Sequence, residues 1–149
     1  MRITLPALVA LPLMSATTSL LAAVEDRLAF AIPNVPLASI LDLILEWSPA
    51  SEFIKTGLRL AGMDIREARH VMAATCPLTY APRIPKDRLM IVAGAGDRFA
   101  PPKHSRLLWD HWDRPALHWF PGNHLLHLDQ GKYLKEMARF MRGIGFDRV

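Results

Sequence analysis

The sequence has little cysteine and no long run of charge. Cys76 is the only cysteine among 149 residues, so no disulfide can form within the chain and cysteine usage indicates no redox compartment. The net charge is +4, but the basic residues are scattered. The densest basic set has helical spacing and is more simply a solvated helix face: Lys132, Lys135, Arg139 and Arg142. We therefore expect no nucleic-acid partner.

The sequence also lacks a recognisable metal-binding motif. Five histidines fall in its last third, namely His104, His111, His118, His124 and His127. Their spacings match no standard ligand pattern, and no set of Cys or Glu residues accompanies them. We therefore expect no metal and no cofactor.

The overall composition is that of one globular domain. Hydrophobic residues make up 51% of the chain and charged residues 21%, which excludes a disordered tail. A chain of this length buries roughly two-thirds of its unfolded surface, enough for a single core. There is no internal repeat and no low-complexity segment.

The N-terminal segment carries no charge from Ile3 to Val24 and has three interpretations. It resembles a signal peptide with Arg2 as its basic start and Ala22-Ala23 as a cleavage site. It is also long enough for a membrane anchor, although Pro6 and Pro12 weaken that interpretation. The third interpretation, which we favour, is a buried strand followed by a buried helix. We accordingly expect a cytoplasmic protein, with export or anchoring through residues 1–23 as the alternative.

Strands and helices are expected to alternate along the rest of the chain. Short apolar runs predict strands over 28–32, from 89 onward and over 116–120. Caps and 3.6-residue periodicity predict helices starting after Ser39, over 51–61, from Asp64 to about 76, over 101–112 and after Asp129. The last helix is expected to bury a stripe of Leu134, Met137, Phe140, Met141 and Ile144. This order predicts an α/β fold with a mostly parallel sheet flanked by helices.

An acid and a histidine follow two of the predicted strands. Asp97 comes after the strand that starts near Leu89, and His124 comes after the strand over 116–120. Because functional groups of α/β sheets gather at the carboxyl ends of the strands, we expect these two side chains to meet. An aspartate that accepts a hydrogen bond from His Nδ1 fixes the tautomer and leaves Nε2 free to act as a base.

The two motifs around these residues resemble the C-terminal part of the α/β-hydrolase family. They are G-A-G-D-R-F-A-P-P at Gly94 to Pro102 and F-P-G-N-H at Phe120 to His124. The resemblance implies that Asp97 is the triad acid and His124 the triad base, with His127 as the alternative base. It also implies a single truncated hydrolase-like domain over 1–149. Residues 39–76 would form a helical cap-like insertion and residues 87–149 the unit that carries the acid and the histidine.

The nucleophile that the family places in G-x-S-x-G is missing from this sequence. The family's usual order puts the turn on Ala10 to Met14, so that Pro12 stands at the serine position. Proline supplies neither an attacking oxygen nor a backbone N–H. Leu13 would stand where the family donates one oxyanion-hole N–H. Ser15 is nearby but lacks the flanking glycines.

Two hypotheses of function follow. In the first, the chain belongs to an ester or acyl hydrolase of the serine-hydrolase type that acts on small ester-like substrates, its nucleophile lost or supplied upstream, and is catalytically incomplete. In the second, it is a non-catalytic remnant or a partner-binding module. A short sheet would also leave an apolar edge unpaired, which predicts a homodimer through that edge.

Overall fold

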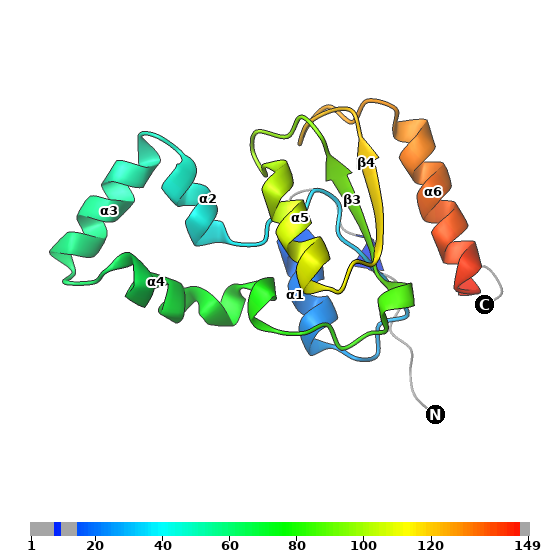
Figure 1. Ribbon diagram of the computed structural model, residues 1–149, viewed down its shortest axis with the longest axis horizontal. Coiled ribbons are helices and arrows are strands. Elements are labelled where there is room, and N and C mark those ends of the chain that lie inside the picture. Colours follow the sequence, from blue (N-terminus) through cyan, green and yellow to red (C-terminus); the bar gives the residue numbers. More distant parts are fainter. Residues whose placement is uncertain (1–7, 10–14, 147–149) are drawn as a thin grey trace.

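The computed structural model describes residues 8–9 and 15–146 of the chain, and its elements follow the expected alternation. The strands are β1 (Leu8–Val9), β2 (Ala31–Ile32), β3 (Met90–Gly94) and β4 (Ala116–Phe120). The helices are α1 (Ser15–Val24), α2 (Ile40–Glu46), α3 (Ala50–Leu60), α4 (Ile65–Met72), α5 (Pro102–His111) and α6 (Gln130–Gly143). Figure 1 shows the strands at the centre of the molecule and the helices α2 to α4 extending away from them.

The strands form a short parallel sheet. β1 pairs with β2 and β3 pairs with β4, both in parallel. Parallel bridges from Ala31 to Leu89 and from Asn34 to Val92 join the two pairs, so that the spatial order is β1, β2, β3, β4. The prediction of an α/β fold with a parallel sheet is confirmed. The strand expected over 28–32 is shortened to Ala31–Ile32.

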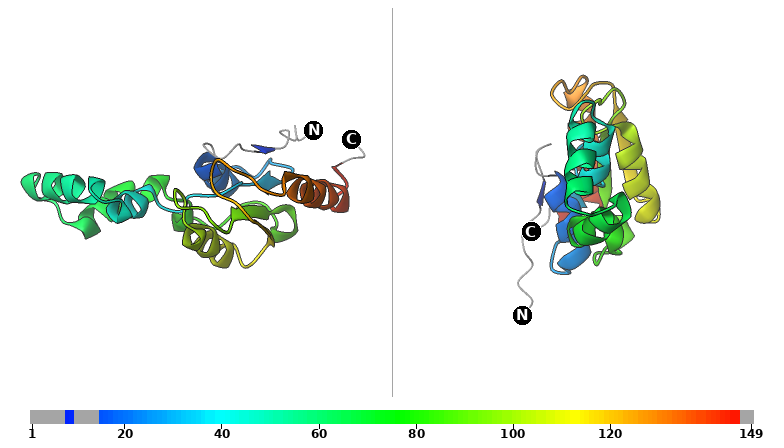
Figure 2. Two further views of the ribbon diagram at one scale, coloured as in Figure 1. Left: turned by 90° about the horizontal axis from the view of Figure 1, so that it is seen from above. Right: turned by 90° about the vertical axis from the view of Figure 1, so that its left-hand side faces the viewer.

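Helices cover both faces of the sheet. Leu89, Ile91 and Ala93 point to one face and pack with residues of α1 and α5. Met90 and Val92 alternate with them and pack on the other face with residues of α6. This alternation follows from the period of two in a strand, and it explains why every residue of β3 is buried. The view from above shows α6 on the opposite side of the sheet from α1 and α5 (Figure 2).

Residues 39–76, for which the sequence predicts a helical insertion, contain the helices α2, α3 and α4, which together we call the arm (Figures 1 and 2). The caps predicted for α2 and α4 are confirmed. The Ser39 side chain accepts a hydrogen bond from the backbone N–H of Asp42, and Asp64 and Glu67 form a reciprocal capping box at the start of α4. Gly62 adopts a positive φ of 68° just after α3.

The closing helix differs in detail from its prediction. Asp129 precedes α6, but its side chain makes no capping hydrogen bond; it forms an ion pair with Lys132 instead. Tyr133 and Met137 are the buried residues of α6, whereas Leu134 is 49% exposed. The expected stripe is therefore wrong at its first position, because Tyr133 reaches back to the loop after β4 and brings its own side of the helix to the sheet.

The helix α1 lies inside the fold. Its residues Ala22 and Ala23, the cleavage site of the signal-peptide interpretation, are both buried, and Ala22 packs with residues of the sheet. Within the described residues, no helix is both long and apolar enough to cross a membrane. The predicted turn around Pro12 and Leu13 lies outside the described residues.

Candidate functional site

The carboxyl ends of β3 and β4 carry two loops that are hydrogen-bonded to each other. Ala95 N donates to Phe120 O at 3.0 Å, and Gly96 N donates to Gly122 O at 2.8 Å. A Cβ atom on Gly96 would lie 3.1 Å from the Gly122 carbonyl oxygen, closer than side chains normally pack. Glycine at this position therefore allows the acid loop and the histidine loop to approach.

Asp97 is held rigidly by its own loop. Its Oδ1 accepts hydrogen bonds from the backbone N–H groups of Phe99 at 2.7 Å and Ala100 at 2.8 Å. Its side chain is fully buried, so these bonds replace the water that a carboxylate would otherwise require. The second oxygen, Oδ2, is left to face the histidine loop.

The structure brings Asp97 and His124 together. His124 Nδ1 donates to Asp97 Oδ2 at 3.0 Å, and the histidine side chain is 10% exposed. Because the carboxylate only accepts hydrogen bonds, this contact places the proton of a neutral imidazole on Nδ1. His124 Nε2 is buried and has no hydrogen-bond partner among residues 15–146. The geometry is that of an imidazole whose second nitrogen is available to accept a proton.

The loop that presents His124 is built by the two residues before it. Asn123 Oδ1 accepts from the backbone N–H groups of Leu125 at 3.0 Å and Leu126 at 2.9 Å, and Asn123 N donates back to Leu126 O. Gly122 has a φ of 147°, and a Cβ there would collide with the Leu126 carbonyl oxygen. Glycine and asparagine thus set the tight turn that aims the imidazole at Asp97.

The alternative residues occupy supporting positions. His127 Nδ1 is 3.0 Å from the Tyr133 hydroxyl and its Nε2 is 3.3 Å from the His124 carbonyl oxygen, so both ring nitrogens are engaged. Ser15 is buried at the start of α1, and its hydroxyl donates to Val35 O at 3.1 Å. His124 is therefore better placed than His127 to act as a base toward a bound molecule.

A cavity of about 580 Å³ opens beside the pair. Asp97, His124, Phe99 and Leu125 line it, together with the Arg98 side chain and the glycine and asparagine of the two loops. Its mixture of apolar walls and a few polar groups is typical of small-molecule sites.

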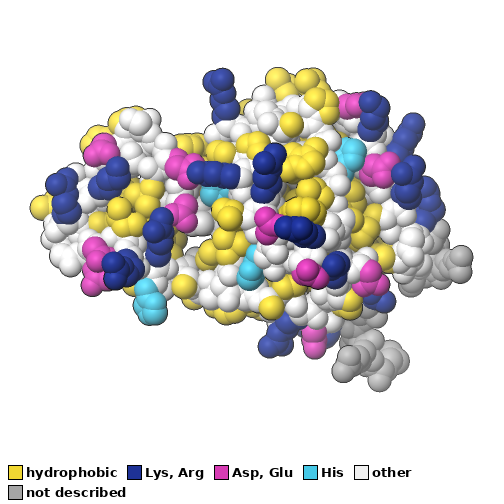
Figure 3. All heavy atoms as spheres, in the orientation of Figure 1, with side chains coloured by type: hydrophobic (Ala, Val, Ile, Leu, Met, Phe, Trp, Pro, Cys, Tyr) yellow, Lys and Arg dark blue, Asp and Glu magenta, His cyan; other side chains and the backbone are white. Residues whose placement is uncertain are grey.

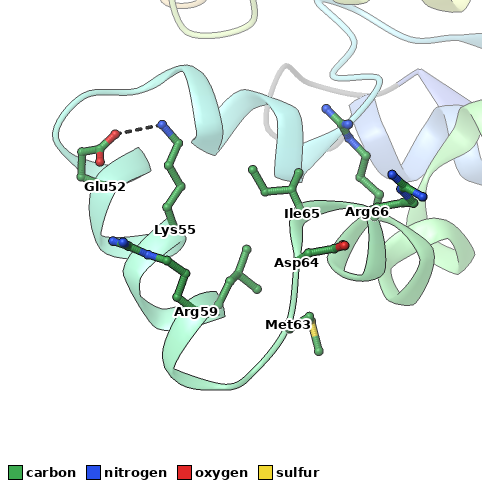
Figure 4. Close-up of a pocket in the computed structure, with 9 residues that line it drawn as sticks. Glu52, Lys55, Arg59, Met63, Asp64, Ile65 and Arg66 are labelled. Carbon is green, nitrogen blue, oxygen red and sulfur yellow. Dashed lines mark hydrogen bonds and ion pairs between the residues drawn. The ribbon is translucent and has the colours of Figure 1, made fainter.

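The arm contains a larger concavity of about 760 Å³ between α3 and α4 (Figure 4). Two of its charged side chains, Lys55 and Glu52, form an ion pair with each other at 2.8 Å, and Arg69 pairs at 2.6 Å with Asp42, which lies outside the lining. Burial opposes the shift, but the hydrogen bond from Arg69 holds the pKa of Asp42 below its ordinary value. The concavity contains no histidine and no buried acid.

A second buried histidine lies at the junction of the arm and the core. His104, on α5, is almost fully buried, and neither of its ring nitrogens has a hydrogen-bond partner in the described part of the chain. Burial lowers the pKa of His104, while the nearby Glu46 carboxylate opposes this shift. We find no group of three or more metal-ligating side chains within residues 8–9 and 15–146.

Two aromatic contacts beside the site were not predicted from the sequence. The Phe99 ring lies 4.7 Å from the His124 ring, and the Trp47 ring lies 4.9 Å from that of Phe99. Phe99 is part of the acid motif, so its position near the site was recoverable from the sequence. Trp47 lies 52 positions away at the end of α2, and no local pattern connects it to this loop.

Comparison with known proteins finds relatives but no family. No family model matches the chain. It is 32% identical over 110 residues to the uncharacterized proteins Rv2627c and MT2702 of two Mycobacterium tuberculosis strains, H37Rv and CDC 1551 / Oshkosh. The similarity covers 71% of this chain and 25% of each relative, so the chain spans about a quarter of their length.

Proposed function

We propose that the chain carries the acid and base of an ester or acyl hydrolase related to the α/β-hydrolases, with Asp97 as the acid and His124 as the base. The single observation that carries this proposal is the 3.0 Å bond between a buried carboxylate and an imidazole whose Nε2 has no partner within residues 15–146. The substrate class is a small ester or similar acyl compound with an apolar group, matching the walls formed by Phe99 and Leu125.

The order of elements supports the hydrolase relationship. The parallel strands β3 and β4, the helix α5 between them and the closing helix α6 surround the acid and the histidine as the resemblance implies. The arm occupies the place of the cap-like insertion. In addition, the strand β1 precedes the helix α1 along the chain, the order of strand and helix that flanks the nucleophile in the family.

With Pro12 at the serine position, water is the attacking group in our proposal. His124 Nε2 accepts a proton from water while the water oxygen attacks the ester carbonyl carbon, giving a tetrahedral intermediate with a negative oxygen. The intermediate then collapses, and the imidazolium returns the proton to the departing alkoxide. The products are a carboxylic acid and an alcohol, and Asp97 stabilises the imidazolium between the two steps.

This reaction is expected to be slow. Our proposal assigns no oxyanion-hole donor, and one such donor typically contributes about 10²- to 10³-fold. A positioned general base alone contributes about 10²- to 10⁴-fold. We therefore expect weak esterase activity.

The test is the hydrolysis of p-nitrophenyl acetate and butyrate by the purified protein and by Asp97→Asn. We expect turnover above background and a loss of at least about tenfold in kcat/KM for the variant, because the amide no longer stabilises the imidazolium. Equal rates for both proteins would overturn the assignment of the acid.

A fluorophosphonate probe identifies the nucleophile. Attack by water predicts no covalent labelling. Labelling that disappears in Ser15→Ala would instead make Ser15 the nucleophile and replace the water mechanism with a covalent one.

A second candidate, a non-catalytic partner-binding module, is favoured by the exposed leucines of the loop after β4. Leu125, Leu126 and Leu128 are all exposed, and apolar side chains gather over this region in Figure 3. The outer edge of β4 has no further strand beside it among the described residues, which fits a second copy of the chain. Sedimentation at micromolar concentration tests this candidate: a dimer without esterase activity supports it, and an active monomer contradicts it.

A further inference from the structure

We propose that Phe99 is a positioning residue for His124 and that Trp47 transmits the position of the arm to this histidine through Phe99. The inference rests on the proposed function in that His124 is taken as the base. Its observable, however, is the behaviour of the imidazole itself, which is measurable whether or not the protein turns over an ester.

Three rings lie in series from the arm to the site. The Trp47 and Phe99 rings meet nearly edge to face, with centroids 4.9 Å apart and an interplanar angle of 77°. The Phe99 and His124 rings lie 4.7 Å apart at 41°. Both distances fall within the range in which aromatic rings attract each other. Among the described residues, the Trp47 ring contacts the Phe99 ring and not the His124 ring, so the path from ring to ring passes through Phe99.

Phe99 is fixed at both of its ends. Its backbone N–H donates to Asp97 Oδ1 at 2.7 Å, while its ring covers His124. One residue therefore orders the acid through its main chain and the base through its side chain. Phe99 is 43% exposed, and in such an open position a ring stays in one rotamer only if a neighbour holds it. Trp47 is that neighbour.

The end of α2 is anchored next to this stack. Trp47 is the C-cap residue of α2, and its backbone N–H donates a hydrogen bond to Ile44 O at 3.1 Å. The preceding residue, Glu46, forms an ion pair with Lys103 on α5, which links the arm to the core. This ion pair holds the end of α2, and with it Trp47, next to Phe99; a shift of this end of the arm that breaks the ion pair would move the Trp47 ring away from Phe99.

The consequence is a difference in how firmly the imidazole is held. When Phe99 is clamped between Trp47 and His124, the imidazole keeps its bond to Asp97, and the Nδ1 proton is protected from water. When Trp47 moves away and Phe99 is released, the His124 imidazole turns more often and its Nδ1 proton exchanges faster with solvent. Conformational restraint of the base in this way would make the arm a determinant of catalytic geometry.

The experiment measures exchange of the His124 Nδ1 proton by NMR in the full chain, for Trp47→Leu, Phe99→Leu and the double variant. We expect exchange about fivefold faster in each single variant, the factor that an aromatic pair contact typically supplies. The double variant should match Phe99→Leu, because Trp47 acts only through Phe99. Phe53→Leu is the matched control, since Phe53 is an aromatic residue of the arm that is 76% exposed and should leave exchange unchanged.

Two results would overturn the inference. One is an unchanged exchange rate in Trp47→Leu, and the other is a Trp47→Leu effect that persists in full when Phe99 is already leucine. Thermal unfolding of each variant shows that it is folded at the temperature of measurement. A wild-type protein that has no esterase activity, in a series whose variants show the expected Nδ1 exchange rates, would contradict the proposed function and leave the inference intact. Esterase activity in the wild type together with an unchanged Nδ1 exchange rate in Trp47→Leu would contradict the inference and leave the proposed function intact.

Discussion

The core and the arm each contain a cavity lined by charged side chains, but they use charge differently. In the core the Asp97 carboxylate is fully buried, and its three hydrogen bonds come from two backbone N–H groups and one imidazole. In the arm the acidic and basic side chains lie at the surface and pair with one another, as Glu52 does with Lys55. Figure 3 shows the same mixture of blue and magenta spheres across the arm.

This difference teaches that cavity size is a poor guide to chemistry here. The arm has the larger cavity, about 760 Å³ against about 580 Å³, but its charges are screened by water and their pairings contribute little. The smaller cavity has one buried acid in a fixed geometry, where an unpaired group would be costly. Substitutions in the two regions should therefore differ sharply in effect.

The largest difference is expected between two glycines. Gly122→Ala places a Cβ against the Leu126 carbonyl oxygen and 3.0 Å from Leu128 N, at a positive φ that alanine avoids. It should destabilise the protein by at least about 3 kcal/mol and displace His124. Gly57→Ala, in the middle of α3 with nothing within 4 Å of the new Cβ, should stabilise it by about 0.5–1 kcal/mol. Urea unfolding of both variants measures the contrast, and similar effects would contradict it.

Removal of the buried acid should have the next largest effect. Asp97→Ala leaves the N–H groups of Phe99 and Ala100 and the Nδ1 of His124 without their acceptor. We expect a loss of about 2–3 kcal/mol in the free energy of unfolding, because hydrogen bonds to a charged acceptor are the strong ones. A loss below about 1 kcal/mol, measured by chemical denaturation, would mean that Asp97 is not the organising group of the loop.

His104 should give a smaller effect of the opposite sign. His104→Leu removes a buried imidazole that has no hydrogen-bond partner in the described residues, and it should stabilise the protein by about 1 kcal/mol. Burial lowers the pKa of His104 in the folded state. Above its ordinary pKa of 6.5 the imidazole is neutral in both the folded and the unfolded state, so its titration costs no stability. As the pH falls below 6.5, the unfolded state binds the proton more readily and the wild type loses stability. Denaturation at pH 8 and pH 5.5 should therefore show a larger advantage of the variant at the lower pH. An advantage that does not grow on acidification would contradict this account.

The smallest effect is expected in the arm. Arg69→Ala removes the 2.6 Å ion pair with Asp42, but both side chains are substantially exposed. We expect a loss below about 1 kcal/mol that shrinks further in high salt. A loss as large as that of Asp97→Ala would erase the distinction between the two regions.

Much of the fold, in the core and in the arm, was predictable because its signals are local. The apolar run of β3, the prolines before α5 and the caps of α2 and α4 each determine structure within a few residues. The meeting of Asp97 with His124 followed from the rule that loops at the carboxyl ends of adjacent parallel strands converge.

The remaining features depend on contacts between distant segments. Leu134 was expected inside, but the bond of Tyr133 to His127 turns another side of α6 to the sheet. The contact of Trp47 with Phe99 depends on the direction in which the arm leaves the core, and no periodicity encodes that direction. That His104 has no hydrogen-bond partner among the described residues is likewise visible only once α5 is packed.

The central claim is that His124, held by Asp97, is the base of an ester-hydrolysing site. The most direct measurement is p-nitrophenyl butyrate hydrolysis by the wild type, His124→Gln and His127→Gln. We expect His124→Gln to lose at least about 100-fold of the rate above background, since a positioned general base contributes about 10²- to 10⁴-fold. His127→Gln should retain most of the rate. Equal hydrolysis by the wild type and His124→Gln would contradict the account.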